Sequence, residues 1–157
     1  MEERGTAVCI GEDVDTDMII AGRYLRTKDR KVWADHAFED YDPSIAGRLK
    51  GSVIIAGKNI GCGSSREQAA IALKEAGVLA VVSPSFARIF FRNLVNTGIL
   101  VFETDEIKCK DGDEVIFSAD EDRVEVAGIH YDAKPISESM KEIIRAGGLI
   151  EYMRKRR

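Results

Sequence analysis

The clearest hydrophobic pattern lies in the middle of the chain. Three short, continuously apolar runs at 53–56, 78–82 and 99–102 predict buried strands. The two segments between them carry apolar residues at the period of an amphipathic helix, and each is followed by a glycine, Gly77 or Gly98. Strands that alternate with helices are typical of parallel strands joined by right-handed crossovers. The pattern therefore predicts a parallel β–α–β–α–β unit.

The flanking regions are less regular. Residues 7–10 predict a short strand, and residues 31–38 predict a short helix inside a long polar connection. Residues 114–117 and 123–127 predict two strands around an acidic turn, and a helix is expected over 137–145. The basic tail that follows suits the negative end of a helix better than it suits a nucleic-acid-binding patch.

Two serines are predicted to cap the central helices. Ser64 and Glu67 have the S-x-x-E spacing of a capping box, and Ser85 precedes the second helix. The apolar positions of this second helix are Phe86, Ile89, Phe90 and Leu94.

Length and charge narrow the class of protein. A chain of 157 residues with 45% apolar and 32% charged residues is expected to form one domain over 1–157 with a full core. Its net charge of -4 argues against general binding of nucleic acid, because no basic excess neutralises phosphates. Its apolar runs are too short to span a membrane, and acidic residues stand where a signal peptide is basic and then apolar. We therefore expect a cytoplasmic protein.

The cysteines give little support for a metal site. The chain has three cysteines, Cys9, Cys62 and Cys109. Their number is odd, they lie far apart in the sequence, and they form no CxxC motif. This argues against a disulfide framework and against a self-contained zinc or iron–sulfur site. Two histidines cannot supply a histidine-rich site either. A metal that the chemistry required would have to come from another chain.

The strongest local signal for function is the glycine-rich loop at 57–63, which leads into a helix. The unpaired amides and the positive end of that helix favour an anion. The loop lacks the lysine of a Walker motif, and it lacks the third glycine and the later acidic residue of a dinucleotide fold. A carboxylate is therefore the better ligand, and Arg66 on the first turn would bind it in bidentate fashion.

Two side chains of this region are candidates for chemistry. Cys62 lies near the helix N-terminus, which lowers the pKa of a thiol, but the simpler interpretation is a small residue packed in a tight loop. Ser64 is either a helix cap or a reactive hydroxyl, and the two roles are compatible. The G-x-S-x-G motif of hydrolases is absent.

Six motifs together resemble the swivel domain of the aconitase superfamily, and the resemblance covers nearly the whole chain. They are 58–67 (KNIGCGSSRE), 85–93 (SFARIFFRN), 96–98 (NTG), 13–17 (DVDTD), 22–25 (GRYL) and 146–149 (AGGL). A free-standing domain of this length is similar to the small subunits of the 3-isopropylmalate dehydratase and homoaconitase families. The resemblance implies an α/β fold, a swivelling β/β/α domain in which the parallel unit carries the glycine-rich loop.

The resemblance also implies an activity that needs a second chain. The reaction is that of a hydro-lyase, which isomerises a hydroxy acid by dehydration and rehydration. A separate large catalytic subunit is implied to hold a [4Fe-4S] cluster, with no metal bound by this chain. The implied substrate is a small di- or tricarboxylate, with neither nucleic acid nor a membrane as partner.

Residue roles follow from the same resemblance. Ser64 matches the catalytic base, and Asp17 matches a catalytic carboxylate that orients groups of the partner. Ser65 and Arg66 match contacts to a substrate carboxylate. Serine is a weak base unless its alkoxide is stabilised, which the loop amides, the helix dipole and Arg66 would provide. Gln68 stands where many relatives carry histidine, and we assign it no role.

The segment after Gly22 is implied to choose the substrate, with Tyr24, Arg26 and Thr27 as predicted contacts. An apolar segment would suit the branched chain of isopropylmalate, whereas Arg26 can pair with the additional carboxylate of homoaconitate. Arg26 can also bind a carboxylate common to both acids, or lie in solvent. Both substrates stay open, with isopropylmalate preferred because it is the commoner one in the family.

Two other classes of protein remain as alternatives. A non-catalytic carboxylate-binding or regulatory module would bind ligand alone, and a nucleotide-binding domain would need the fingerprint residues that are missing. Apolar surface for a partner is expected on the side of the glycine-rich loop and around Tyr24 and Trp33.

Overall fold

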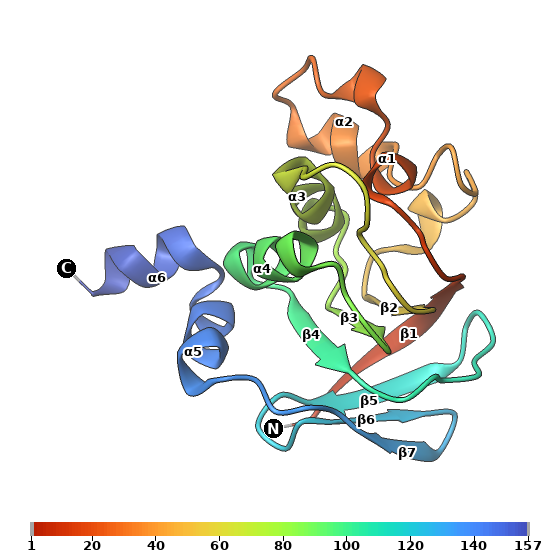
Figure 1. Ribbon diagram of the computed structural model, residues 1–157, viewed down its shortest axis with the longest axis vertical. Coiled ribbons are helices and arrows are strands. Elements are labelled where there is room, and N and C mark those ends of the chain that lie inside the picture. The colour runs from red at the N-terminus through yellow and green to blue at the C-terminus, as the bar shows by residue number, and fades with distance from the viewer. Residues whose placement is uncertain (1, 157) are drawn as a thin grey trace.

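The computed structural model describes residues 2–156 and contains a seven-stranded sheet (Figure 1). The strands are β1 (Glu3–Ile10), β2 (Ser52–Ala56), β3 (Ala80–Ser83), β4 (Leu100–Glu103), β5 (Glu114–Ser118), β6 (Arg123–Val126) and β7 (Ile129–Asp132). The helices are α1 (Thr16–Ile19), α2 (Arg30–Asp35), α3 (Glu67–Glu75), α4 (Arg88–Thr97), α5 (Glu138–Ala146) and α6 (Leu149–Lys155), with 3-10 helices η1 (Gly22–Tyr24) and η2 (Ala46–Arg48).

The sheet has a parallel half and an antiparallel half, in the order β4-β3-β2-β1-β5-β6-β7. Strands β1 to β4 pair in parallel, and their register aligns Ala7, Val53, Ala80 and Leu100 in one row. All four side chains are buried, so the row crosses the core without interruption. The predicted α/β class and the parallel unit are confirmed, the latter as β2–α3–β3–α4–β4.

The sheet curls back on itself. Phe102 of β4 and Phe117 of β5 are separated by three intervening strands, yet their ring centroids lie 6.0 Å apart in an edge-to-face contact. After β7, the Lys134 amide donates to the Glu103 carbonyl at 2.9 Å. Such contacts require a strongly twisted, curled sheet. Figure 1 shows the β5–β7 strands grouped together below the helices that cover the parallel half.

The predicted helix starts are wrong at both serines. Helix α3 begins at Glu67, and its cap residue Arg66 makes no side-chain capping bond, so Ser64 does not cap it. Ser85 also lies before its helix, because α4 begins at Arg88 with Ala87 as its cap residue. The Ser85 hydroxyl instead accepts a hydrogen bond from the Asn59 amide at 2.8 Å. Both serines belong to the loops that lead into the helices.

The predicted helix ends are correct. Gly77 and Gly98 both adopt positive φ directly after α3 and α4, a conformation that glycine reaches without steric cost. The start of α5 is also as predicted, because the Ser137 hydroxyl accepts from the Met140 amide at 3.2 Å.

Three features of the periphery differ from expectation. Strand β7 was not anticipated, because its residues are mostly exposed and carry no apolar pattern. The basic tail forms helix α6, which lies at the edge of the molecule beside α5 (Figure 1). Trp33 is only 7% exposed, so it does not supply the expected partner surface.

No helix within 2–156 combines the length and the apolar character needed to cross a membrane.

Candidate active site

Two segments that are distant in the sequence, 13–17 and 58–64, lie side by side. The Thr16 amide donates to the Cys62 carbonyl at 3.0 Å, and the Thr16 hydroxyl donates to the Ser64 carbonyl at 2.6 Å. Thr16 is buried, so these bonds are shielded from water. The acidic segment after β1 therefore supports the glycine-rich loop after β2.

Glycine is required at two positions of this loop. Gly61 has φ of +84°, and a Cβ atom there would lie 2.1 Å from Cγ of Phe90. Gly63 has φ of +89°. These two glycines let the loop turn tightly over α4, which brings the next residues to the surface.

Ser64 and Ser65 line a hollow of about 320 Å³ next to this turn. Its other lining residues are Thr16, Gly61, Cys62, Gly63, Arg66, Ala87, Arg88, Ile89, Phe90 and Asn93. Both serines are exposed, and within the described chain neither hydroxyl has a hydrogen-bond partner. The two hydroxyls are therefore free to meet a ligand.

Arg66 joins the two sides of the site. Its Nη2 atom lies 2.7 Å from a carboxylate oxygen of Asp17, and its Nη1 atom donates to the Ile20 carbonyl at 3.0 Å. The Arg66 side chain is 21% exposed and the Asp17 side chain 62%. Two predicted site residues are thus in direct contact, with the guanidinium held in place and the carboxylate at the surface.

Helix α4 contributes four residues whose part in the site was not predicted: Arg88, Ile89, Phe90 and Asn93. Ile89 is one of the apolar positions identified in this helix, but it is 52% exposed and lines the hollow. Arg88 is exposed and adds a second cation to the one at Arg66. The spacing that places Ile89, Phe90 and Asn93 on one helix face was visible in the sequence, but nothing showed that this face borders the glycine-rich loop.

The environment of Cys62 favours the simpler interpretation. Burial, together with the nearby Asp15 and Asp13 carboxylates, raises the pKa of the Cys62 thiol. The thiol also donates to the Asp13 carbonyl at 3.6 Å. Because the thiol stays protonated, Cys62 is a packed residue of the loop and not an activated nucleophile.

The predicted substrate-selecting residues do not line the hollow. The Tyr24 hydroxyl donates to the Glu39 carboxylate at 2.7 Å, and the Thr27 hydroxyl accepts from the Asp29 amide at 3.1 Å. Arg26 is exposed and has no partner among residues 2–156. Of these three predicted contacts, the Tyr24 hydroxyl is taken up by Glu39, whereas the Arg26 guanidinium is free and the Thr27 hydroxyl can still donate to a ligand.

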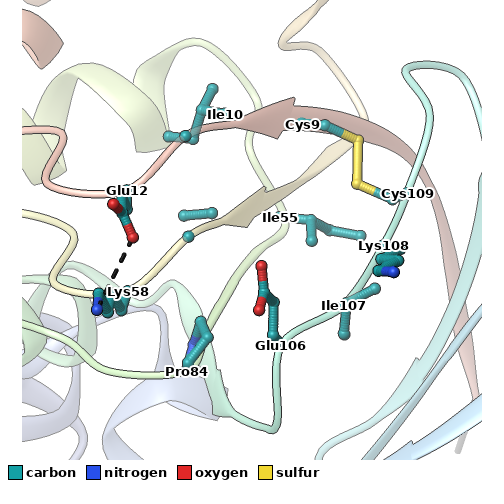
Figure 2. Close-up of a pocket in the computed structure, with 13 residues that line it drawn as sticks. Cys9, Ile10, Glu12, Ile55, Lys58, Pro84, Glu106, Ile107, Lys108 and Cys109 are labelled. Carbon is teal, nitrogen blue, oxygen red and sulfur yellow. Dashed lines mark ion pairs between the residues drawn. A yellow bond between two sulfur atoms is a disulfide. The ribbon is translucent and has the colours of Figure 1, made fainter.

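A larger hollow of about 540 Å³ lies at the carboxyl ends of the parallel strands, and none of the predicted site residues lines it (Figure 2). A disulfide between Cys9 and Cys109 forms part of its wall. The argument against a disulfide framework therefore did not anticipate this one pair. Spacing could not reveal this pair, because 100 residues separate the two cysteines and only the fold brings them together.

The residues of this chain do not fit an iron–sulfur cluster. Such a cluster needs several cysteine thiolates, whereas two of the three cysteines are joined to each other. Across the described residues there is also no group of three or more His, Cys, Asp or Glu side chains that could hold a metal ion.

Known proteins of one family match this chain along its whole length. The family model "Aconitase C-terminal domain" matches residues 12–107, which include both segments of the site. The 3-isopropylmalate dehydratase small subunit of Thermodesulfovibrio yellowstonii is 45% identical to this chain, over 99% of this chain and 96% of its own length. That of Moorella thermoacetica is 48% identical, over 98% of this chain and 95% of its own length.

Two further relatives widen the comparison. The methanogen homoaconitase small subunit of Methanothermobacter thermautotrophicus is 45% identical over 97% of this chain and 91% of its own length. A crystal structure of 3-isopropylmalate dehydratase (leuD) from Methanocaldococcus jannaschii superposes with a TM-score of 0.93 at 42% identity, covering 99% of this chain and 95% of that one. The predicted family is thereby confirmed: this chain belongs to the aconitase C-terminal domain family.

Proposed function

We propose that this chain is the small subunit of a hydro-lyase that converts 2-isopropylmalate to 3-isopropylmalate by dehydration and rehydration, a step of leucine biosynthesis. The main observation behind this proposal is that Ser64, Ser65 and Arg66 line one hollow, and that Asp17 forms an ion pair with Arg66. The names and the full-length similarity of the relatives support the same assignment.

Ser64 is the proposed base of this reaction. Its Oγ atom would take the proton from a carbon next to a substrate carboxylate while the C–O bond of the neighbouring carbon breaks and releases the hydroxyl, which leaves a C=C bond. In the rehydration, the hydroxyl adds to the carbon that lost the proton, and Ser64 returns the proton to the carbon that lost the hydroxyl. A serine can do so only where positive charge stabilises the alkoxide. Two sources of positive potential lie nearby: the Arg66 guanidinium, and the N-terminus of α3, which begins three residues after Ser64.

Ser65 and Arg66 are the proposed contacts to a substrate carboxylate, and Arg88 lies where it could add a further charge. A guanidinium binds a carboxylate through two parallel hydrogen bonds, which fixes the orientation of the acid. The Arg66 guanidinium is bonded to the Ile20 carbonyl and to the Asp17 carboxylate, so its position is set before the substrate binds. The exposed Asp17 carboxylate is the proposed orienting group toward the partner.

The open hollow supports the need for a partner chain. The serines and Ile89 are exposed, so water has free access to the site of the proposed proton transfer. We propose that a large catalytic subunit covers this face and holds the [4Fe-4S] cluster, for which residues 2–156 provide no ligand set. We further propose that residues 1–157 act as one domain of this assembly in the cytoplasm.

Homoaconitate is the second candidate substrate, and Arg26 is the observation that favours it. A free, exposed guanidinium suits an additional carboxylate, and one relative is named a homoaconitase small subunit. The wild-type complex and the Arg26→Val variant should be compared on both acids. Preference of the wild type for homoaconitate would overturn the assignment of isopropylmalate.

The test of the proposed function is reconstitution. This chain, a cluster-loaded large subunit, and the two together should be assayed for dehydratase activity. We expect activity only in the mixture. Binding of a hydroxy acid by this chain alone, with an inactive mixture, would instead support a non-catalytic carboxylate-binding module.

A further inference from the structure

A compact cluster of charged and aromatic side chains lies outside the Ser64 hollow, centred on Glu39. Tyr24 Oη lies 2.7 and 2.8 Å from the two oxygens of the Glu39 carboxylate, and Arg23 donates to it at 3.0 Å. The Nδ1 atom of His36 is in close contact with the same carboxylate. One carboxylate therefore serves three donor side chains.

Glu39 remains ionised in this setting. The hydrogen bonds from Tyr24, His36 and Arg23 lower the pKa of Glu39 to about 2. An ionised carboxylate only accepts hydrogen bonds, so His36 carries its proton on Nδ1. The cluster keeps these bonds near neutral pH, where each is assisted by charge.

Ring contacts fix the orientation of Tyr24 as well. The Tyr24 and His36 rings are stacked, with centroids 4.2 Å apart and planes inclined by 11°. The guanidinium carbon of Arg23 lies 4.9 Å from the centroid of the Tyr24 ring. Arg23 is held in turn by both carboxylate oxygens of Asp40, at 2.7 and 2.9 Å.

The segment after Tyr24 is fixed at both of its ends. The Trp33 indole donates to the Tyr24 carbonyl at 3.0 Å, and Trp33 is buried. At the other end, the Asp29 side chain caps α2 by accepting from the Lys31 amide at 3.0 Å. Arg26 lies within the short span between these anchors, so the placement of Tyr24 sets where the Arg26 side chain begins.

We propose that Glu39 is a positioning residue for substrate selection: it anchors Tyr24 and thereby directs Arg26 toward the substrate. This proposal rests on the proposed function, with Arg26 as a contact to a substrate carboxylate, either one common to both acids or the additional one of homoaconitate. It also gives Tyr24 another role than a substrate contact, because its hydroxyl is bonded to Glu39.

Hydrogen exchange of the full chain tests the anchoring without any activity. Glu39→Gln replaces the one charged acceptor of three hydrogen bonds with a neutral amide, and we expect the amides of Tyr24 and Leu25, which donate to the Ala21 and Gly22 carbonyls, to exchange about tenfold faster. Asp35→Asn is the matched control, because it breaks the exposed ion pair between Lys31 and Asp35 on α2 without touching the cluster. Equal exchange in Glu39→Gln and wild type would overturn the proposal.

A double-mutant cycle in the assembled enzyme tests the effect on selection. In the wild-type background, Glu39→Gln should change the ratio of kcat/KM between homoaconitate and isopropylmalate about five- to tenfold, mainly through KM. In the Arg26→Val background the same change should be less than twofold. An equal effect in both backgrounds would overturn the proposal, because it would indicate a merely structural role.

Tyr24→Phe gives a second route if Glu39→Gln does not fold. It keeps the ring stacked on His36 and removes only the hydroxyl. It should change the rate of amide exchange and the ratio of kcat/KM between the two acids in the same direction as Glu39→Gln. Failure of the proposed function is separately visible: a wild-type complex inactive on both acids would overturn that function, whereas unchanged exchange would overturn the anchoring alone.

Discussion

The Arg66 guanidinium lies 2.7 Å from the Asp17 carboxylate and at the same time donates to the Ile20 carbonyl. One side chain of the glycine-rich loop is thus bonded to both the start and the end of the α1 segment. The planar guanidinium has donors directed to each partner, and this geometry is specific to arginine. The position of Arg66 is therefore a property of the folded chain before any ligand binds.

Arg66→Lys should keep the charge and lose this geometry. A lysine ammonium cannot bond the Ile20 carbonyl and Asp17 while also presenting two parallel donors to a substrate. We expect KM of the reconstituted enzyme for its hydroxy acid to rise about tenfold or more. Arg92→Lys, on the exposed surface of α4, serves as the control. Equal kinetics for both variants would contradict the assigned contact.

Gly61→Ala should disrupt the loop itself. The added methyl group would meet Phe90, and alanine is strained at φ of +84°. We expect a loss of about 2–5 kcal/mol in the free energy of unfolding, measured by urea denaturation. Gly112→Ala is matched in φ, at +92°, but has open space around it, so it should cost about 1 kcal/mol. A similar loss for both variants would show that the contact with Phe90 does not matter.

Stability should depend on pH through Glu39. The pKa of Glu39 is about 2 in the folded chain, below its ordinary value of 4.5. At pH values between these two, the unfolded chain therefore binds more protons than the folded chain. The stabilisation is fully present above about pH 5 and is lost as the pH falls toward 2. The difference in unfolding free energy between wild type and Glu39→Gln should therefore be larger at pH 6 than at about pH 3. A constant difference across this range would be inconsistent with the lowered pKa.

The disulfide should contribute to stability. It closes a loop of 100 residues between Cys9 and Cys109, which restricts the unfolded chain. Cys9→Ser should lower the free energy of unfolding by about 2–5 kcal/mol, and a reductant should have the same effect on wild type. Cys62→Ser should leave the response to reductant unchanged, since Cys62 is a free thiol. Insensitivity of the wild type to reductant would rule out the pair.

Local signals predicted the fold well where a single residue decides the outcome. Gly77 and Gly98 follow the ends of their helices because glycine reaches positive φ without the steric cost that a Cβ atom brings. The apolar runs of β2, β3 and β4 identified buried strands because both faces of a parallel sheet are covered.

The errors arose where distant segments compete for the same group. Ser85 has the character of a helix cap, but its hydroxyl binds the Asn59 amide of a loop that precedes it by 26 residues. Ile89 fits the apolar period of α4, yet its side chain borders the hollow instead of the core. The contact between Arg66 and Asp17 is equally non-local, so the order of residues alone could not reveal it.

The role of Ser64 is tested most directly by turnover of Ser64→Ala in complex with a cluster-loaded large subunit. Loss of a general base lowers rates by about 100- to 10,000-fold, and we expect kcat to fall within this range while the two subunits still co-purify. An alanine variant that assembles normally and turns over at nearly the wild-type rate would contradict the assignment of Ser64 as the base.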